Sequence, residues 1–237
     1  MVEISGKHMR ILVVGHRGCA GLEPENTIRG FKRAAKLGCD AIEMDIRLTK
    51  DGVPVIMHDT TLDRTTNGKG WLAEKTLAQL KNVRCADGKP VPTLQDVIDA
   101  VGDKTFLVLE LKDEGTAQPV LETLKQNCVS RNVELSSFWH RELLLAKKLD
   151  PKISTGVIIS GCPIRPDEIA RKASAGRMHA CHWYINKGFV NALHEKKIFV
   201  DAWVVDEEPW ISRAASFGVD AITSNRPDHL LKALRRM

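Results

Sequence analysis

The feature that most constrains the fold of this chain is an alternation of short apolar runs with amphipathic segments, which continues to the C-terminus. The short runs are typical of buried strands, and the segments between them have the apolar spacing of helices. The strand-like runs are 10–15, 41–46, 105–112, 133–138, 153–159, 178–183, 198–205 and 221–223. The helix-like segments are 27–37, 93–101, 117–126, 141–149, 166–175, 187–196, 207–217 and 228–235.

Eight strands, each followed by a helix, predict an α/β fold of the (β/α)8 or TIM-barrel type, and 237 residues is close to the usual length of such a barrel. The alternative is a doubly wound open sheet, although no GxGxxG motif follows the first strand. Residues 51–92 are too long for one connecting loop, so we interpret them as an insertion after the second strand with a short helix at 77–82. We therefore expect a single domain over residues 1–237.

The composition limits the class of function. The chain is 43% hydrophobic and 27% charged, which is typical of a globular protein. Its formal charge is +5, but no run of lysine and arginine is interleaved with aromatic residues, so we do not expect a nucleic-acid partner. A mildly basic chain suits a small anionic substrate.

No apolar run approaches the roughly 18 residues that would cross a membrane, and the N-terminal "MVEISGKHMR" has no apolar signal core. We therefore expect a cytoplasmic protein without stable membrane insertion. The sequence does not indicate the role of residues 1–8, and it leaves a homo-oligomeric state open.

The cysteines form no CxxC pair and no tight framework, so we expect small core residues or free thiols and neither disulfides nor zinc ligands. These six residues are Cys19, Cys39, Cys85, Cys128, Cys162 and Cys181.

Two acidic residues share one face of the second strand. Glu43 and Asp45 are two positions apart in a run that otherwise suits a core, and two buried carboxylates require a positive charge between them. Glu110 reaches the end of the next strand, where a (β/α)8 barrel has its active site. Three carboxylates without cysteine favour Mg²⁺ or Ca²⁺.

The alternative for these carboxylates is salt bridges with Arg17, Arg47 or Lys112. Arg17 and Lys112 also suit contact with phosphate oxygens, and the alternative for Arg17 is a helix cap or a carboxylate partner.

Two histidines, His16 and His58, each follow a strand-like run toward the expected catalytic face. General acid–base catalysis requires one group that accepts a proton and one that donates it, and this pair would supply both. We interpret the other histidines as surface, helix or loop residues, with the reservation that His182 ends a strand-like run and would face the same rim. They are His8, His140, His179, His182, His194 and His229.

Residues 16–70 contain, in order, HRG, PENT, E-x-D, T-x-D-G, P-V-x-x-H-D and L-x-R-T-T-x-G. This series resembles the N-terminal signature of the glycerophosphodiester phosphodiesterases. "VPTLQDVID", "LELK" and "SSF" are similar to later parts of the same family, so the resemblance extends over the whole chain.

The resemblance implies a barrel with a small insertion after the second strand, one divalent cation, and hydrolysis of glycerophosphodiesters to glycerol 3-phosphate and an alcohol. The metal ligands that it implies are Glu43, Asp45 and Glu110. The acid–base pair that it implies is His16 and His58. The residues that it places at the phosphate or beside the substrate are Arg17, Lys112 and Trp203.

The C-terminal half departs from the common pattern of that family. "WVVDEE" replaces W-T-V-N, with Asp206 at the asparagine position, and "TSNRPD" replaces T-D-x-P. These changes leave the pocket for the alcohol and the head-group preference open.

The signature contains no serine or cysteine nucleophile, which suggests a two-step reaction. A glycerol hydroxyl next to the phosphate loses its proton to one histidine and attacks phosphorus, while the other histidine protonates the departing alcohol. Water then opens the cyclic phosphate. Holding the nucleophile in the substrate itself can contribute on the order of 7–11 kcal/mol. The alternatives are a lysophospholipase of the D or C type and a non-catalytic phosphate-binding barrel.

Overall fold

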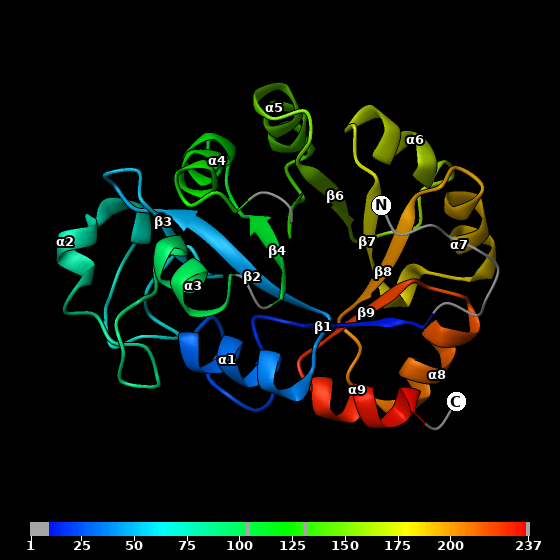
Figure 1. Ribbon diagram of the computed structural model, residues 1–237, viewed down its shortest axis with the longest axis horizontal. Coiled ribbons are helices and arrows are strands. Elements are labelled where there is room, and N and C mark those ends of the chain that lie inside the picture. Colours follow the sequence, from blue (N-terminus) through cyan, green and yellow to red (C-terminus); the bar gives the residue numbers. More distant parts are fainter. Residues whose placement is uncertain (1–9, 103–104, 130–131, 236–237) are drawn as a thin grey trace.

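The chain forms a closed parallel β-barrel surrounded by helices, as the computed structural model in Figure 1 shows. The structure describes residues 10–102, 105–129 and 132–235, so residues 1–8 lie outside the described residues. The barrel strands are β1 Leu12–Gly15, β2 Ala41–Leu48, β4 Phe106–Leu111, β5 Val133–Ser137, β6 Ser154–Ile159, β7 Arg177–Cys181, β8 Phe199–Trp203 and β9 Ala221–Ser224. Because β1 pairs with both β9 and β2, the barrel is closed. The predicted TIM barrel is confirmed, and the open doubly wound sheet is wrong.

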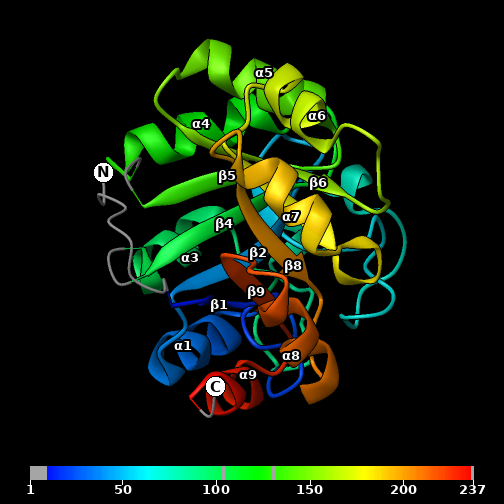
Figure 2. The same cartoon turned by 90° about the vertical axis from the view of Figure 1, so that its right-hand side faces the viewer.

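Helices follow the barrel strands and cover the outside of the barrel (Figure 2). They are α1 Ile28–Leu37, α3 Leu94–Val101, α4 Ala117–Gln126, α5 His140–Leu149, α6 Pro166–Lys172, α7 Lys187–His194, α8 Glu208–Ser216 and α9 Pro227–Leu234. Thr27 caps α1 by accepting from the backbone N–H of Gly30, and Thr93 and Asp96 form a capping box at α3. None of the helices in the described ranges has the length and hydrophobicity to cross a membrane.

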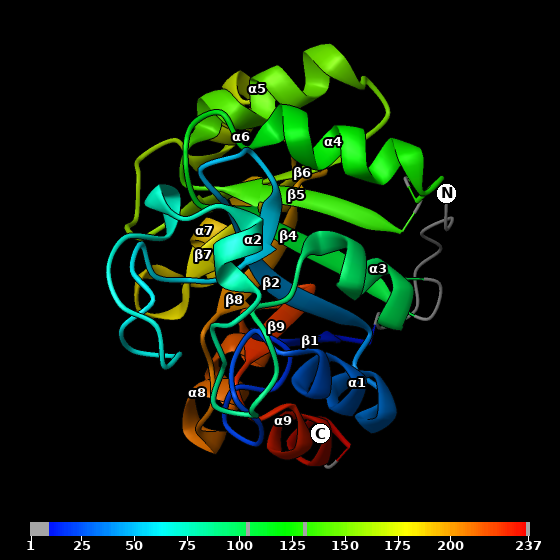
Figure 3. The ribbon, with the colours of Figure 1, turned by 90° about the vertical axis from the view of Figure 1, so that its left-hand side faces the viewer.

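The segment between β2 and α3 has structure of its own, on the side of the barrel that faces the viewer in Figure 3. It contains β3 Pro54–Ile56, the 3₁₀ turn η1 Leu72–Glu74 and α2 Leu77–Leu80. The helix was predicted at this place, whereas β3, which pairs antiparallel with β2, was not. A small hydrophobic cluster fills the segment, and its buried residues are Val55, Met57, Leu62, Leu72, Leu80 and Val91.

The inward face of β2 changes from apolar to acidic toward the C-terminal end of the strand. Side chains of a strand alternate between its two faces, so inward-facing Ala41 is followed by Glu43 and Asp45 on the same face. Met44 and Ile46 lie on the opposite face and are fully buried in the core between the barrel and its helices. The same strand therefore contributes both to the core and to a polar site.

The cysteines are free thiols, as expected. Cys19 and Cys39 are buried, and burial raises the pKa of Cys19 to about 11 and that of Cys39 to about 12. Both are therefore uncharged core residues at neutral pH.

Candidate active site

The turn after β1 presents His16 and Arg17 to the mouth of the barrel. Arg17 and Gly18 have positive φ angles of 49° and 88°, a conformation that favours glycine. A Cβ on Gly15 would lie 2.1 Å from the carbonyl oxygen of Gly18, so this tight turn requires glycine at position 15. The backbone N–H of Arg17 donates to Oε2 of Glu43 over 2.8 Å. The turn is thereby attached to a carboxylate of β2.

Three carboxylates meet at this end of the barrel. β2 and β4 pair in a register that places Asp45 opposite Glu110. One oxygen each of Glu43, Asp45 and Glu110 lies within 4.8 Å of the others. Lys112 Nζ is 2.7 Å from Glu110 Oε1 and 3.3 Å from Asp45 Oδ1, and Arg17 Nε is 3.2 Å from Asp45 Oδ2.

The salt-bridge alternative accounts for Asp45 but not for Glu43. Burial alone would raise the pKa of Asp45, but Lys112 and Arg17 outweigh it and hold that pKa below its usual value. The predicted candidate Arg47 pairs with Asp113, through Nη1 at 2.5 Å from Oδ1.

Glu43 lacks a comparable positive partner. Its Oε1 is buried and has no hydrogen-bond partner among the described residues. Burial and the charges of Asp45 and Glu110 raise the pKa of Glu43 well above its usual value. An orphaned buried carboxylate oxygen beside two further carboxylates is a donor set that fits a hard divalent cation. These three residues could therefore hold Mg²⁺ or Ca²⁺.

The two predicted histidines lie at this site, and each has one ring nitrogen held by a protein oxygen. His16 Nδ1 lies 2.7 Å from Oδ1 of Asn225, and His58 Nδ1 lies 2.8 Å from Oδ1 of Asp59. Burial, together with the charge of Arg17, lowers the pKa of His16. Burial also lowers the pKa of His58, despite its carboxylate neighbours. Burial therefore favours the neutral form of both imidazoles, which is the form that can accept a proton.

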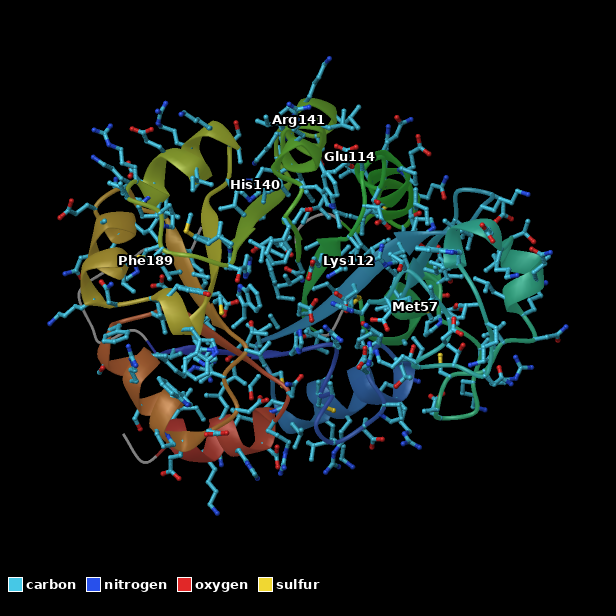
Figure 4. All side chains as sticks on the ribbon, turned by 180° about the vertical axis from the view of Figure 1, so that it is seen from behind. Met57, Lys112, Glu114, His140, Arg141 and Phe189 are labelled. Atoms are coloured by element: carbon cyan, nitrogen blue, oxygen red, sulfur yellow. The ribbon has the colours of Figure 1, made fainter. Side chains whose placement is uncertain are left out.

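A cavity of about 150 Å³ brings the predicted residues together. The predicted residues that line it are His16, Arg17, Glu43, His58, Glu110, Lys112 and Trp203. Asp45, the remaining one, is buried below this surface. Lys112 follows β4 and is labelled near the middle of the barrel in Figure 4.

An aromatic pair forms part of the cavity wall. The ring of Trp203, at the end of β8, meets that of Phe138 edge to face, with centroids 5.8 Å apart. Trp203 Nε1 is buried without a hydrogen-bond partner among the described residues. The wall therefore combines an apolar surface with a free donor.

Two further histidines, His179 and His182, lie in β7 or just after it. His182 lies in the 3₁₀ turn η2 His182–Tyr184, against Trp183 and Trp210, and does not line the cavity. The interpretation of His179 as a surface, helix or loop residue is wrong. His179 is on β7, is 7% exposed and lines the cavity, because the inward face of β7 is polar at this level. His8 lies outside the described residues.

His179 is the centre of a buried ionic network. Its Nε2 lies 2.5 Å from Glu134 Oε1 and its Nδ1 lies 2.9 Å from Asp201 Oδ2. Burial alone would lower the pKa of His179, but these carboxylates outweigh it and raise the pKa to about 10. Both ring nitrogens therefore donate, as an imidazolium between two acceptors.

This network predicts a pH-dependent stability. A pKa raised from 6.5 to about 10 gives stabilisation that is complete below pH 6.5 and is lost as the pH rises toward 10. The free energy of unfolding in urea should fall over this window, and His179→Gln should remove on the order of 2–4 kcal/mol of that fall. His140→Gln, which changes a histidine outside the network, should keep the wild-type slope. Equal slopes in wild type and His179→Gln would contradict this account.

Further polar residues connect the segment between β2 and α3 to the turn after β1. Arg64 donates to Glu25 through Nη1 over 2.7 Å and to Asp59 through Nε over 2.7 Å. Glu25 in turn accepts from Arg17, and Asp59 from His58. Hydrogen bonds from Arg64 lower the pKa of Asp59 well below its usual range, so Asp59 remains an acceptor. Glu25, Asp59 and Arg64 all stand within the motifs of residues 16–70, but no role was predicted for them.

The chain is similar to known proteins over most of its length. The sequence model of the glycerophosphoryl diester phosphodiesterase family matches residues 16–229. A glycerophosphodiester phosphodiesterase of Caldanaerobacter subterraneus subsp. tengcongensis is 34% identical over 96% of this chain and 99% of its own length. One of Bacillus altitudinis is 31% identical over 95% of this chain and 98% of its own length. A phosphodiesterase of Oleispira antarctica, solved with its product sn-glycerol-3-phosphate, is 30% identical with a TM-score of 0.89, covering 94% of this chain and 96% of that one.

The fold and the cavity define a TIM-barrel hydrolase whose acidic, basic and imidazole groups gather at the C-terminal ends of the strands. The family match spans most of the chain, and relatives above 30% identity cover nearly all of it. The chain belongs to the glycerophosphoryl diester phosphodiesterase family.

Proposed function

We propose that this protein hydrolyses glycerophosphodiesters to glycerol 3-phosphate and an alcohol, with Mg²⁺ or Ca²⁺ held by Glu43, Asp45 and Glu110. The observation that carries the proposal is the unpartnered buried oxygen of Glu43 in a cavity that two histidines also line. The Oleispira antarctica relative, which holds sn-glycerol-3-phosphate, supports the choice of substrate class.

The proposed cation would polarise the phosphoryl oxygens and offset the negative charge that develops on them. Arg17 and Lys112 line the same cavity and would bind the remaining phosphate oxygens. The side chains of Arg17 and Lys112 also contact Asp45, which limits the positions that they can take. The two positive charges are therefore held beside the same carboxylate. The ring of Trp203 would border the organic part of the substrate.

The proton transfers are assigned to His16 and His58. Each has Nδ1 within hydrogen-bond distance of an oxygen of a neighbouring side chain, which leaves Nε2 for the substrate. In the proposed first step one imidazole accepts the proton of the glycerol hydroxyl next to the phosphate, and that oxygen forms a bond to phosphorus. The other imidazole, in its protonated form, gives its proton to the departing alcohol. In the second step water opens the cyclic phosphate, and the two histidines exchange roles.

Two substrates test the substrate class. Glycerophosphocholine should release glycerol 3-phosphate and choline, and its analogue without the neighbouring glycerol hydroxyl should be cut poorly, because it lacks the internal nucleophile. Normal turnover of that analogue would exclude the cyclic route without excluding hydrolysis. Failure to cut glycerophosphocholine, at any concentration of added Mg²⁺ or Ca²⁺, would contradict the proposed function.

Lysophospholipid hydrolysis is the second candidate, because large apolar side chains are exposed in the loops that follow the barrel strands. They include Trp71, Phe138, Trp139, Ile164, Trp183 and Tyr184. Lysophosphatidylcholine in the same assay separates the two activities. Faster cleavage of lysophosphatidylcholine than of glycerophosphocholine would favour the second candidate.

A further inference from the structure

We propose that Asn225 and Asp206 are positioning residues that hold His16 in a single neutral tautomer, with the proton on Nδ1 and the lone pair of Nε2 directed to the cavity. The consequence for catalysis rests on the proposed acid–base function of His16, whereas the tautomer itself does not.

The carboxylate of Asp206 determines how the amide of Asn225 is turned. Asp206 Oδ2 accepts from Asn225 Nδ2 over 2.8 Å. Asp206 Oδ1 accepts from the backbone N–H of Asn225 and from the hydroxyl of Ser224, each over 2.8 Å. A carboxylate only accepts hydrogen bonds, so three donors must face Asp206. Turning the amide over would place its oxygen against the carboxylate and lose one of these bonds.

The amide of Asn225 in turn determines the tautomer of His16. With Nδ2 committed to Asp206, the oxygen Oδ1 faces His16 Nδ1 at 2.7 Å. An amide oxygen only accepts, so His16 Nδ1 must carry the proton. In a neutral imidazole the other nitrogen, Nε2, is then the one that can accept a proton. His16 Nε2 lies 3.9 Å from Glu43 Oε2.

This arrangement predicts opposite results for a single and a reciprocal double substitution. In Asp206→Asn, one carboxylate oxygen becomes an NH₂ group that opposes Nδ2 of Asn225. Asn225 then turns over and presents its own NH₂ to His16, which moves the proton of His16 to Nε2. We expect kcat to fall roughly 10- to 10³-fold with KM nearly unchanged, since a catalytic histidine in the wrong tautomer can lose up to about 10⁴-fold.

The double variant Asp206→Asn/Asn225→Asp should restore the lost activity. The new carboxylate at position 225 accepts from His16 Nδ1 and from the new amide at position 206. The oxygen of that amide still accepts from the Ser224 hydroxyl and from the backbone N–H of residue 225. All donors are again satisfied, and the tautomer of His16 is that of the wild type.

The deciding measurement is the ¹⁵N NMR spectrum of the His16 ring in wild type, the single variant and the double variant, at about pH 8, where an ordinary histidine is neutral. The kinetic constants are measured on the same samples. His16→Asn identifies the signal by its loss. Asp99→Asn, the same chemical change on an exposed position of α3, is the control and should leave both the spectrum and kcat unchanged.

We expect a proton on Nδ1 in the wild type and the double variant and on Nε2 in Asp206→Asn. A proton on Nδ1 in all three proteins, or a folded double variant as inactive as the single one, would overturn the inference. A tautomer that moves in Asp206→Asn while kcat stays constant would support the network and contradict the proposed function of His16.

Discussion

Replacing either His16 or His58 by alanine is expected to lower kcat by roughly 10²- to 10⁴-fold, the usual size of a general acid–base contribution. Each imidazole lines the cavity, and because its Nδ1 is held by a protein oxygen, its Nε2 is available for proton transfer. Because the carboxylates and Lys112 remain, substrate binding should change less than turnover. Steady-state kinetics with glycerophosphocholine separates the two effects.

His194→Ala is the matched control for both variants. His194 ends α7, contacts Asp220 over 2.8 Å and lies on the opposite side of the barrel from the cavity, just before β8 begins. Its loss should leave kcat near the wild-type value. Wild-type rates in both His16→Ala and His58→Ala would refute the assignment of the acid–base pair. If kcat fell in only one of the two variants, only that histidine would be assigned to proton transfer.

Glu43→Gln is expected to raise the dissociation constant for Mg²⁺ or Ca²⁺ by about 10²-fold or more, since even changes to groups behind metal ligands cost about 10- to 100-fold. Glutamine keeps the size of the side chain and removes the charge that burial makes unfavourable. The metal-free variant should therefore be at least as stable as the metal-free wild type at neutral pH. Isothermal titration calorimetry gives the affinity without reference to turnover.

Glu122→Gln makes the same chemical change on an exposed position of α4 and should bind metal as the wild type does. If calorimetry showed the same affinity in Glu43→Gln as in the wild type, Glu43 would not be a ligand. Its contact with the backbone N–H of Arg17 would then be its main role.

The barrel could be predicted from the sequence because its strands and helices have different apolar periods that repeat along the chain. The carboxylate cluster could be predicted for the same reason. Glu43 and Asp45 share a face of β2 by the two-residue period of a strand, and parallel pairing with β4 places Glu110 opposite Asp45. The two-residue period of a strand and the pairing of neighbouring parallel strands were therefore sufficient to predict the carboxylate cluster.

The network around His179 could not be predicted in this way. Its partners Glu134 and Asp201 belong to β5 and β8, and a lone histidine in a strand gives no sign of which distant carboxylates it will meet. The same holds for the contact of His16 with Asn225, which are 209 residues apart. Such contacts depend on closure of the barrel and on the height along the barrel axis at which each inward side chain lies. The strand β3 was missed because three residues are too few to show a period.

The central claim is that hydrolysis depends on a divalent cation at Glu43, Asp45 and Glu110. It is tested most directly by the rate of glycerol 3-phosphate release from glycerophosphocholine in EDTA and after stepwise addition of Mg²⁺ or Ca²⁺. We predict a fall of about 10²-fold or more in EDTA, since cation stabilisation of transition-state charge is worth several kcal/mol, and full recovery in the wild type. Glu43→Gln should recover only in part. An unchanged rate in protein shown by elemental analysis to be free of metal would contradict the claim.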